Sequence, residues 1–156
     1  MSLRSSELPI PTESAVRLLI TGSREWPDTG DVQSALNFYW DLSGHITVVH
    51  GDAPKGADRM ARNWCEKMND GAVEAIGGIA VDEERYPARW DIYGPWAGPG
   101  RNKDMVDDGA FACLAFIAPC TMAKCRDKDP HGSHGATHCV NLAERAGIVT
   151  IRWTLK

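Results

Sequence analysis

The fold of this chain is decided by two stretches, Leu18-Leu19-Ile20-Thr21-Gly22-Ser23-Arg24 and Val48-Val49-His50-Gly51-Asp52-Ala53-Pro54-Lys55-Gly56-Ala57-Asp58. In each stretch a short apolar run ends at a glycine, and a helix-like segment follows. This layout is typical of a βα turn that binds phosphate, because glycine lets the backbone approach an anion and the helix start supplies free N–H groups. Two such turns in consecutive βα units predict a nucleotide-type ligand at the carboxyl ends of the strands.

Apolar runs and segments with helical periodicity alternate along the rest of the chain. We expect strands at 16–21, 46–50, 79–83, 112–117 and 148–153, and helices at 28–42, 57–68, 100–108 and 136–146. We expect Gly147 to cap the last helix. The remaining stretches are a weak glycine-containing segment at 71–80, a loop rich in Trp, Gly and Pro at 87–99, and an irregular insert at about 119–133.

This alternation predicts an α/β fold, a single Rossmann-like three-layer domain with a mainly parallel sheet. We expect the domain to span residues 16–156 and residues 1–15 to form a flexible N-terminal arm. In an open sheet of this kind ligands bind outside the carboxyl ends of the strands, and both glycine turns fall on that edge. A chain of 156 residues is long enough for one sizeable core.

Composition excludes several classes of protein. The formal net charge of −4 provides no basic field for nucleic acid, so a nucleic-acid partner is not expected. No apolar run approaches the roughly 18 residues that span a bilayer, and the N-terminus lacks the apolar region of a secretory signal. The 5 cysteines are an odd number, which does not fit a disulfide framework. We therefore expect a cytoplasmic protein without a membrane partner.

The insert carries the pattern Cys120-x4-Cys125-x5-His131-x2-His134. Closely spaced cysteines and histidines are the ligands of tetrahedral Zn²⁺. The segment 124–130 is too polar to order itself by packing, and a bound metal explains why a compact domain tolerates it. We therefore predict a structural zinc with these four ligands. With only three of them, an open position could be catalytic.

Two further residues are alternative fourth ligands, His138 and Cys139, and the loop could also be exposed with incidental Cys and His. The other two cysteines, Cys65 and Cys113, fall on apolar faces and are expected in the core.

The first glycine turn offers hydroxyls, backbone N–H groups and the guanidinium of Arg24, whose fork suits a phosphate. The alternative is a tight strand-end turn with Arg24 simply exposed. In the second turn Asp58 stands in the first turn of a helix, where the helix dipole favours a carboxylate without any ligand. Asp52 would repel a phosphate, so it either holds a ribose hydroxyl or points away.

The third candidate region, 90–102, places several aromatic residues just before a helix that begins with Arg101. An aromatic side chain such as Trp90 or Trp96 could stack on a base, and Arg101 could neutralise a phosphate. The alternative is a long loop anchored by buried aromatic side chains.

Four motifs carry a family resemblance: Ile-Thr-Gly-Ser-Arg at 20–24, the second turn at 49–61, Tyr-Gly-Pro-Trp-Ala-Gly-Pro-Gly-Arg-Asn-Lys-Asp-Met at 93–105, and Ser-His-Gly-Ala-Thr-His at 133–138. Together they resemble the YspA-type branch of the SLOG superfamily, which is related to the "lonely guy" or lysine-decarboxylase-like (LOG) proteins. The resemblance implies a Rossmann-like domain, a nucleotide or nucleotide-derived ligand, a homodimer, and a bacterial or phage source. Some relatives are phosphoribohydrolases, and others are thought to sense nucleotide-type signals.

Matching the family motifs position by position implies a set of ligand residues and one catalytic residue. The implied ligand residues are Thr21, Gly22, Ser23, Arg24, Gly51, Ala53, Gly56, Ala57, Asp58, Arg101, Asn102, Met105, Gly135, Ala136 and His138, to which the turn itself adds Asp52. In the hydrolase relatives the arginine that matches Arg101 is catalytic.

The chain departs from the family pattern at two places. Asp52 stands where the branch usually has a glycine. The stretch 133–140 lacks the glutamate of the hydrolase relatives, and the next carboxylate is Glu144. A carboxylate stabilises the oxocarbenium-like transition state of glycosidic cleavage, so its loss favours binding or sensing of the ligand over turnover.

Two enzymatic alternatives remain open. One is a LOG-like phosphoribohydrolase or N-glycosidase, for which His138 is the single acid–base candidate beside Arg101. The other is a metal-dependent hydrolase that uses the Cys/His insert.

Overall fold

The computed structural model describes residues 8–12 and 15–155. Its sheet contains five strands in the order β3-β2-β1-β4-β5, and every neighbouring pair is parallel. The strands are β1 (Ala15–Gly22), β2 (His45–His50), β3 (Asp82–Arg85), β4 (Ala112–Ile117) and β5 (Val149–Thr154). The order reverses where β1 lies beside β4, and in such sheets the crevice at that reversal is where ligands bind. The predicted α/β, Rossmann-like fold is confirmed.

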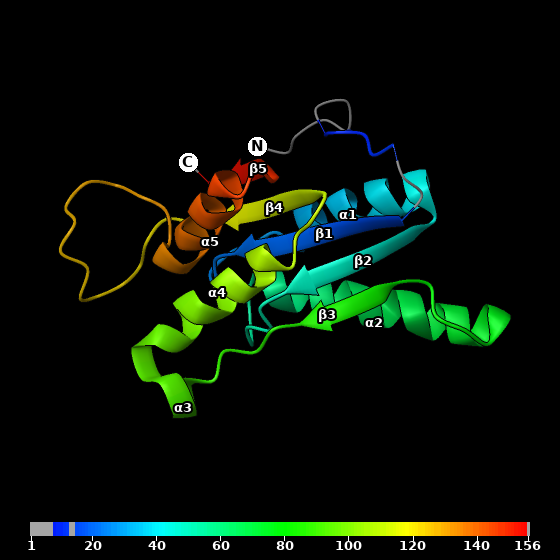
Figure 1. The fold of residues 1–156 in the computed structure, drawn as a ribbon, viewed down its shortest axis with the longest axis horizontal. Helices are drawn as coiled ribbons and strands as arrows, with labels where there is room; N and C mark the ends of the chain where they lie inside the picture. Colours follow the sequence, from blue (N-terminus) through cyan, green and yellow to red (C-terminus); the bar gives the residue numbers. More distant parts are fainter. Residues whose placement is uncertain (1–7, 13–14, 156) are drawn as a thin grey trace.

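Helices cover both faces of the sheet (Figure 1). The helices are α1 (Thr29–Ser43), α2 (Ala57–Ile76), α3 (Trp90–Tyr93), α4 (Ala97–Asp107) and α5 (His134–Arg145), with a 3-10 turn η2 (Gly94–Trp96) between α3 and α4. Along β1, Leu18 and Ile20 belong to the core under α1 and α2, whereas Leu19 belongs to the core under α4 and α5. This alternation follows from the period of two along a strand.

Several element bounds differ from the sequence prediction. The helix expected over 57–68 runs to Ile76, because its stop signal is Gly77, which adopts the left-handed conformation with φ 69°. Gly71 is exposed inside this helix, at a cost of about 1 kcal/mol that a long amphipathic helix tolerates. Part of the expected loop at 87–99 is helical, and α4 begins at Ala97.

The N-terminal segment is anchored where the structure describes it. Leu8 is 7% exposed and belongs to the main core, and the Tyr39 hydroxyl donates to the Pro9 carbonyl at 3.0 Å. These contacts hold Leu8 and Pro9 against the domain, within the stretch 1–15 that the sequence predicts to be a flexible arm. Residues 1–7 and 13–14 of that arm lie outside the described residues. Within the described chain, no helix has the length and apolar character needed to cross a membrane.

Candidate functional site

The two glycine turns pack directly against each other at the carboxyl edge of the sheet. Gly56 has φ 78°, and a Cβ there would lie 2.5 Å from the Cα of Arg24. A Cβ on Gly22 would lie 2.7 Å from the Phe116 carbonyl oxygen and would also overlap Ala57. Both positions require glycine because backbones of neighbouring segments approach closely. Protein packing therefore accounts for these glycines before any ligand is considered.

Ser23 joins the first turn to the segment that follows β4. Its N–H donates to the Phe116 carbonyl at 2.9 Å, and its Oγ accepts from the Ala118 N–H at 2.8 Å. The hydroxyl also hydrogen-bonds to the Ser133 hydroxyl. Ser23 is 3% and Thr21 6% exposed. The side chain of Ser23 is thus engaged by the protein itself at the point where β1 and β4 meet.

Asp58 acts inside the second turn. Its carboxylate accepts from the Ala53 N–H at 3.2 Å, and the residue is 7% exposed. Burial raises the pKa of Asp58, while the neighbouring His50 and Arg101 act in the opposite direction. These contacts indicate that Asp58, in the first turn of α2, helps to order the second glycine turn through its own hydrogen bond.

Asp52 turns to the protein rather than standing free at the edge. It is the single non-glycine residue with positive φ, 55°, among the described residues. Its carboxylate lies 3.3 Å from Arg62 of α2, and its N–H donates to Nδ1 of His50 at 3.0 Å. Because Nδ1 of His50 accepts, Nε2 carries the proton and donates to Glu83 at 2.7 Å. Of the two alternatives for Asp52, pointing away from an anion is the one this geometry favours.

Arg101 lies over the second turn. Its Nη1 donates to the carbonyls of Gly51 and Tyr86, the latter at 3.2 Å, and its Nε donates to Asn102 Oδ1 at 2.9 Å. A Cβ on Gly51 would lie 2.6 Å from Cζ of Arg101, so Gly51 makes room for the guanidinium. Burial lowers the pKa of Arg101, and Asp58 acts against that shift. Within the described residues its Nη2 has no hydrogen-bond partner.

Asn102 connects Arg101 to the start of α5. Its Nδ2 donates to the Gly135 carbonyl at 3.2 Å and to Nδ1 of His138 at 3.2 Å, and the residue is 4% exposed. His138 therefore presents its protonated nitrogen, Nε2, away from Asn102. The side chain of Asn102 therefore hydrogen-bonds to three predicted site residues, Arg101, Gly135 and His138.

The side chains of three predicted ligand residues are buried in the core. Met105 is 1% exposed and packs with Leu19 and Cys113. Ala57 and Ala136 are likewise buried. The side chain of Met105 faces the sheet and serves the core, and its predicted ligand role remains a prediction.

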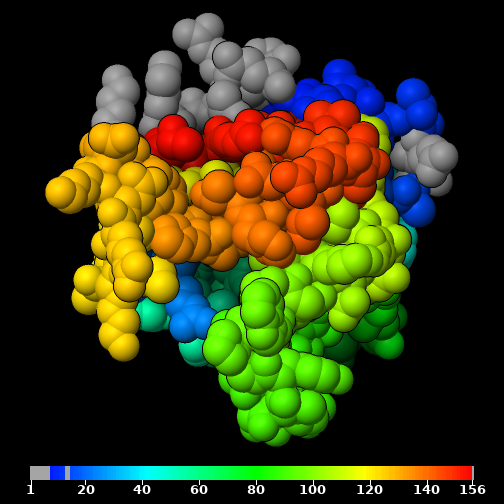
Figure 2. Space-filling view, turned by 60° about the vertical axis from the view of Figure 1, so that its left-hand side comes forward, coloured from blue at the N-terminus to red at the C-terminus, as the bar shows by residue number. Residues whose placement is uncertain are grey.

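Arg24 is exposed and, among the residues that the structure describes, forms no hydrogen bond or ion pair. Its charge contributes to lowering the pKa of Arg101, so the two guanidinium groups share one electrostatic environment. Figure 2 shows a hollow on this side of the molecule, bounded by α5, α4 and the insert, with the segment after β1 at its floor. The hollow lies at the carboxyl edge of the sheet.

The aromatic residues of 90–96 are not buried anchors. Trp90 is 48%, Tyr93 62% and Trp96 77% exposed. Trp90 packs edge-on against Gly98, where a Cβ would lie 2.9 Å from its Cη2. The alternative of a loop anchored by buried aromatics is therefore wrong, and α3 with η2 projects from the body on the carboxyl side of the sheet (Figure 1).

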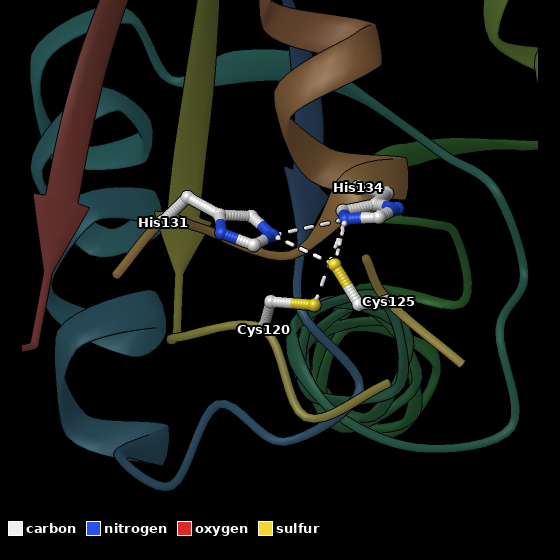
Figure 3. Close-up of side chains that lie close together, drawn as sticks. All are labelled: Cys120, Cys125, His131 and His134. Atoms are coloured by element: carbon white, nitrogen blue, oxygen red, sulfur yellow. Dashed lines mark hydrogen bonds between the residues drawn. The ribbon is translucent and has the colours of Figure 1, made fainter. Parts of the chain in front are cut away.

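The predicted metal ligands converge. The ligand atoms of Cys120, Cys125, His131 and His134 all lie within 4.8 Å of one another, so these residues are positioned to hold a metal ion (Figure 3). Nε2 of His134 lies 3.6 Å from Sγ of Cys120 and 3.5 Å from Sγ of Cys125. Nε2 of His131 lies 3.4 Å from Sγ of Cys125 and 3.0 Å from Nε2 of His134.

These distances match the edges of a tetrahedron around zinc. Bond lengths of about 2.3 Å for Zn–S and about 2.05 Å for Zn–N give S···N edges of about 3.5 Å and N···N edges of about 3.3 Å. Nδ1 of His131 lies 2.7 Å from the Asp129 carbonyl. Donation from Nδ1 to that carbonyl leaves the lone pair on Nε2, the nitrogen that faces the other ligands.

The two alternative fourth ligands lie elsewhere. Cys139 lies in α5 and is fully buried against the sheet with Leu19 and Cys113, and interactions with Cys113 and Thr21 lower its pKa against the opposing effect of burial. His138 is bound by Asn102. Cys65 and Cys113 are buried, as expected for core cysteines.

Comparison with known proteins identifies the family. The family model described as YspA, cpYpsA-related SLOG family matches residues 16–77. The chain is 38% identical over 139 residues to the Gene 61 protein of Mycobacterium phage D29, covering 88% of this chain and 95% of that protein. This chain belongs to the YspA, cpYpsA-related SLOG family. Membership indicates nucleotide-related binding or processing, and the name of the phage protein states no activity. No solved structure matches.

Two residues that organise this SLOG edge are not among the predicted site residues. His50, fully buried, orients Asp52, and Ser133 binds Ser23. The signal for His50 is its position as a polar residue ending an apolar strand, directly before Gly51. Ser133 gives no such signal, because its partner is 110 positions away in the sequence.

Proposed function

We propose that this protein binds a nucleotide or nucleotide-derived small molecule at the carboxyl edge of its sheet and senses it without cleaving it. The observation that carries the proposal is the placement of Arg24 and Arg101 on the two glycine turns: the backbone of Arg24 packs on Gly56, and the guanidinium of Arg101 lies on Gly51. Arg24 has no protein partner among the described residues, and Nη2 of Arg101 is unused. A phosphate between them would relieve their repulsion and accept their N–H donors.

The carboxylates that glycosidic cleavage could use are engaged by other residues or lie far from the ligand edge, which supports binding over cleavage. Asp52 pairs with Arg62, and Asp58 accepts from the Ala53 N–H. Glu144 pairs with Arg152 at 2.6 Å in the last turn of α5, about 15 Å along the helix from the ligand edge. None of the three is free to stabilise an oxocarbenium-like transition state.

A phosphoribohydrolase or N-glycosidase is the second candidate. One observation favours it, the hydrogen-bonded series from Arg101 through Asn102 to His138. In that case His138 would supply the proton at the leaving base and Arg101 would hold the phosphate.

Mass spectrometry separates the two candidates. The protein is incubated with AMP and other nucleoside monophosphates, ADP-ribose and cyclic dinucleotides, and both retained and converted compounds are scored. We expect one compound to be retained intact, and Arg24→Ala to weaken its retention at least tenfold. Arg145→Ala removes an exposed arginine from the last turn of α5, at the opposite end of that helix, and serves as the matched control. Release of free base and sugar phosphate, abolished in His138→Ala, would replace sensing by hydrolysis.

We further propose that the metal is zinc and that it is structural. Two thiolates and two imidazoles form a closed set of four ligands, and a closed site leaves no position for substrate. Metal analysis of protein purified without chelator is expected to give one zinc per chain. Absence of zinc would refute the structural zinc, and absence of any bound metal would refute the metal-dependent hydrolase as well.

Two further expectations from the sequence complete the proposal, a homodimer and a cytoplasmic location. Light scattering in solution tests the dimer directly, and a mass of one chain, 17.1 kDa, would refute it.

A further inference from the structure

The insert between β4 and α5 has a base built from backbone contacts and a tip that lacks a core. Pro119 pairs with Gly132 in an antiparallel bridge, and the Cys120 N–H donates to the His131 carbonyl at 2.8 Å. Beyond this base, the apolar residue Met122 is 58% exposed. A polar loop without buried apolar side chains cannot offset its own conformational entropy. Its order must therefore come from the four converging ligands.

One residue of this insert lies between two metal ligands and also contacts the ligand turn. Ser133 stands directly before His134 and two residues after His131. Its hydroxyl does not cap α5 and instead forms the hydrogen bond to Ser23. Its N–H donates to the Ala118 carbonyl at 3.0 Å, which keeps it against the end of β4.

Ser23 carries this contact onward to the proposed ligand site. The Ser23 carbonyl accepts from the N–H groups of Trp26 at 3.1 Å and Ala57 at 3.4 Å. The next residue in the chain is Arg24, and its Cα packs on Gly56 of the second turn. Displacement of Ser23 would therefore move both glycine turns.

We propose that occupancy of the metal site controls the order of the first ligand turn, through the hydrogen bond between Ser133 and Ser23. This inference rests on the proposed zinc site and on the proposed ligand role of Arg24. The bistable element is the insert, which is ordered with metal bound and open without it. If bound zinc tightens ligand binding at the edge, ligand binding must tighten zinc binding by the same factor, because the coupling of two binding events is reciprocal.

Hydrogen exchange tests the coupling without knowledge of the ligand. Exchange of the Ser23 and Trp26 amides is compared in zinc-loaded protein and in protein stripped with chelator under reducing conditions. We expect about tenfold faster exchange after zinc removal in the wild type. In Ser133→Ala the exchange of these amides becomes independent of zinc, while one zinc per chain is still bound. Ser34→Ala, an exposed serine of α1, is the matched control and keeps the wild-type response.

The possible outcomes distinguish failure of the proposed coupling from failure of the proposed zinc site. If zinc binds but its removal speeds exchange only within 119–131, the coupling is overturned and the zinc site stands. If no zinc binds, the zinc site and the coupling fail together. Cys125→Ser provides a metal-free protein that needs no chelator, and exchange of its Ser23 amide must match that of the stripped wild type.

Discussion

Two connections at the same edge of the sheet are ordered by different means. The turn at 51–56 joins β2 to α2 and is held by protein groups: Arg101 on Gly51, His50 on the Asp52 amide, and the close packing of Gly56. The insert at 119–133 lies between β4 and α5, and its side chains Cys120, Cys125 and His131 converge with His134 of α5 in positions that could hold a metal ion.

The difference shows how a loop can acquire a fixed shape. The turn at 51–56 is short and lies between segments that already pack, so each of its polar groups finds a partner close by. The insert is longer and extends past the packed body, where hydrophobic burial is not available. The proposed metal site would replace burial there, and the two connections should therefore respond to different perturbations.

The largest expected effect comes from Gly56→Ala, which breaks the turn at 51–56. A Cβ at this position would overlap the backbone of Arg24, and the residue would have to keep a φ of 78°, which L-residues avoid. We expect a loss of about 3 kcal/mol or more in the free energy of unfolding, measured by urea denaturation. With zinc supplied well above its dissociation constant, zinc content should stay at one per chain in the folded fraction, because none of the four metal ligands contacts Gly56.

Gly100→Ala is the matched control. Gly100 lies in α4 and is exposed, and a Cβ added there would have no other atom within 4 Å. Alanine is favoured over glycine in a helix, so this variant should be neutral or more stable by up to about 1 kcal/mol. An equal loss of unfolding free energy in Gly56→Ala and Gly100→Ala would show that close packing does not require glycine at position 56.

The opposite perturbation is removal of the metal. Cys125→Ser should abolish zinc binding and, at a free zinc concentration one hundred times the dissociation constant, lower the free energy of unfolding by about 2.7 kcal/mol. Limited proteolysis should then cut within 121–130, while the far-UV circular dichroism of the helices and sheet is retained. Met122→Ala, which changes an exposed side chain of the same insert, should behave as the wild type. Resistance of the zinc-free insert to protease would mean that protein contacts alone order it.

Elements with locally complete signals could be predicted from the sequence. The run 112–117 is six apolar residues, and β4 has these bounds with every residue buried. By contrast, β3 is Asp82–Arg85, four charged residues at the edge of the sheet, whereas the apolar signal favours 79–83. Edge strands tolerate and even benefit from charge, so hydrophobic patterning misplaces them. Tertiary pairing with β2 decides this strand.

The same limit applies to the site. The metal ligands span Cys120 to His134, close enough in sequence for their spacing to reveal them. The contact between Ser23 and Ser133 joins residues 110 positions apart, and no local pattern indicates it. The sequence pattern places the glycines in the right turns, but the reason it gives for them is close approach of the backbone to an anion. The observed reason, contact between backbones, depends on which turns become neighbours.

A third prediction concerns pH and the support beneath the turn at 51–56. Burial acts to raise the pKa of Glu83, but hydrogen bonds from Arg85 and His50 outweigh it and hold that pKa below its ordinary value of 4.5. A lowered folded-state pKa means that the ionised carboxylate stabilises the fold. The contribution is complete above the unfolded pKa and is lost as the pH falls through the folded one.

Glu83→Gln should therefore cost about 1.5 kcal/mol at pH 7, with the two stability curves converging as the pH falls below about 4.5. Unfolding in urea from pH 7 to pH 3 measures this, in a Cys125→Ser background so that acid release of zinc does not contribute. Glu74→Gln changes an exposed carboxylate of α2 and should follow the unsubstituted curve. A constant offset between Glu83→Gln and its parent at every pH would exclude an ionised Glu83 as the supporting group.

The smallest effect sharpens the comparison at a single residue, Asp52, which has a positive φ in the turn at 51–56. Asp52→Gly removes the strain of a side chain at φ 55° but loses the ion pair with Arg62, so it should be close to neutral. Asp52→Ala keeps the strain and also loses the pair, and we expect it to be less stable than Asp52→Gly by about 1 kcal/mol. Arg62→Gln removes this pair, together with the exposed ion pair between Arg62 and Glu66, and leaves the residue at position 52 unchanged. If Arg62→Gln lowers the free energy of unfolding as much as Asp52→Ala does, the ion pair rather than the backbone conformation holds this turn. The turn would then depend on side-chain interactions, as the insert is proposed to depend on its metal ligands.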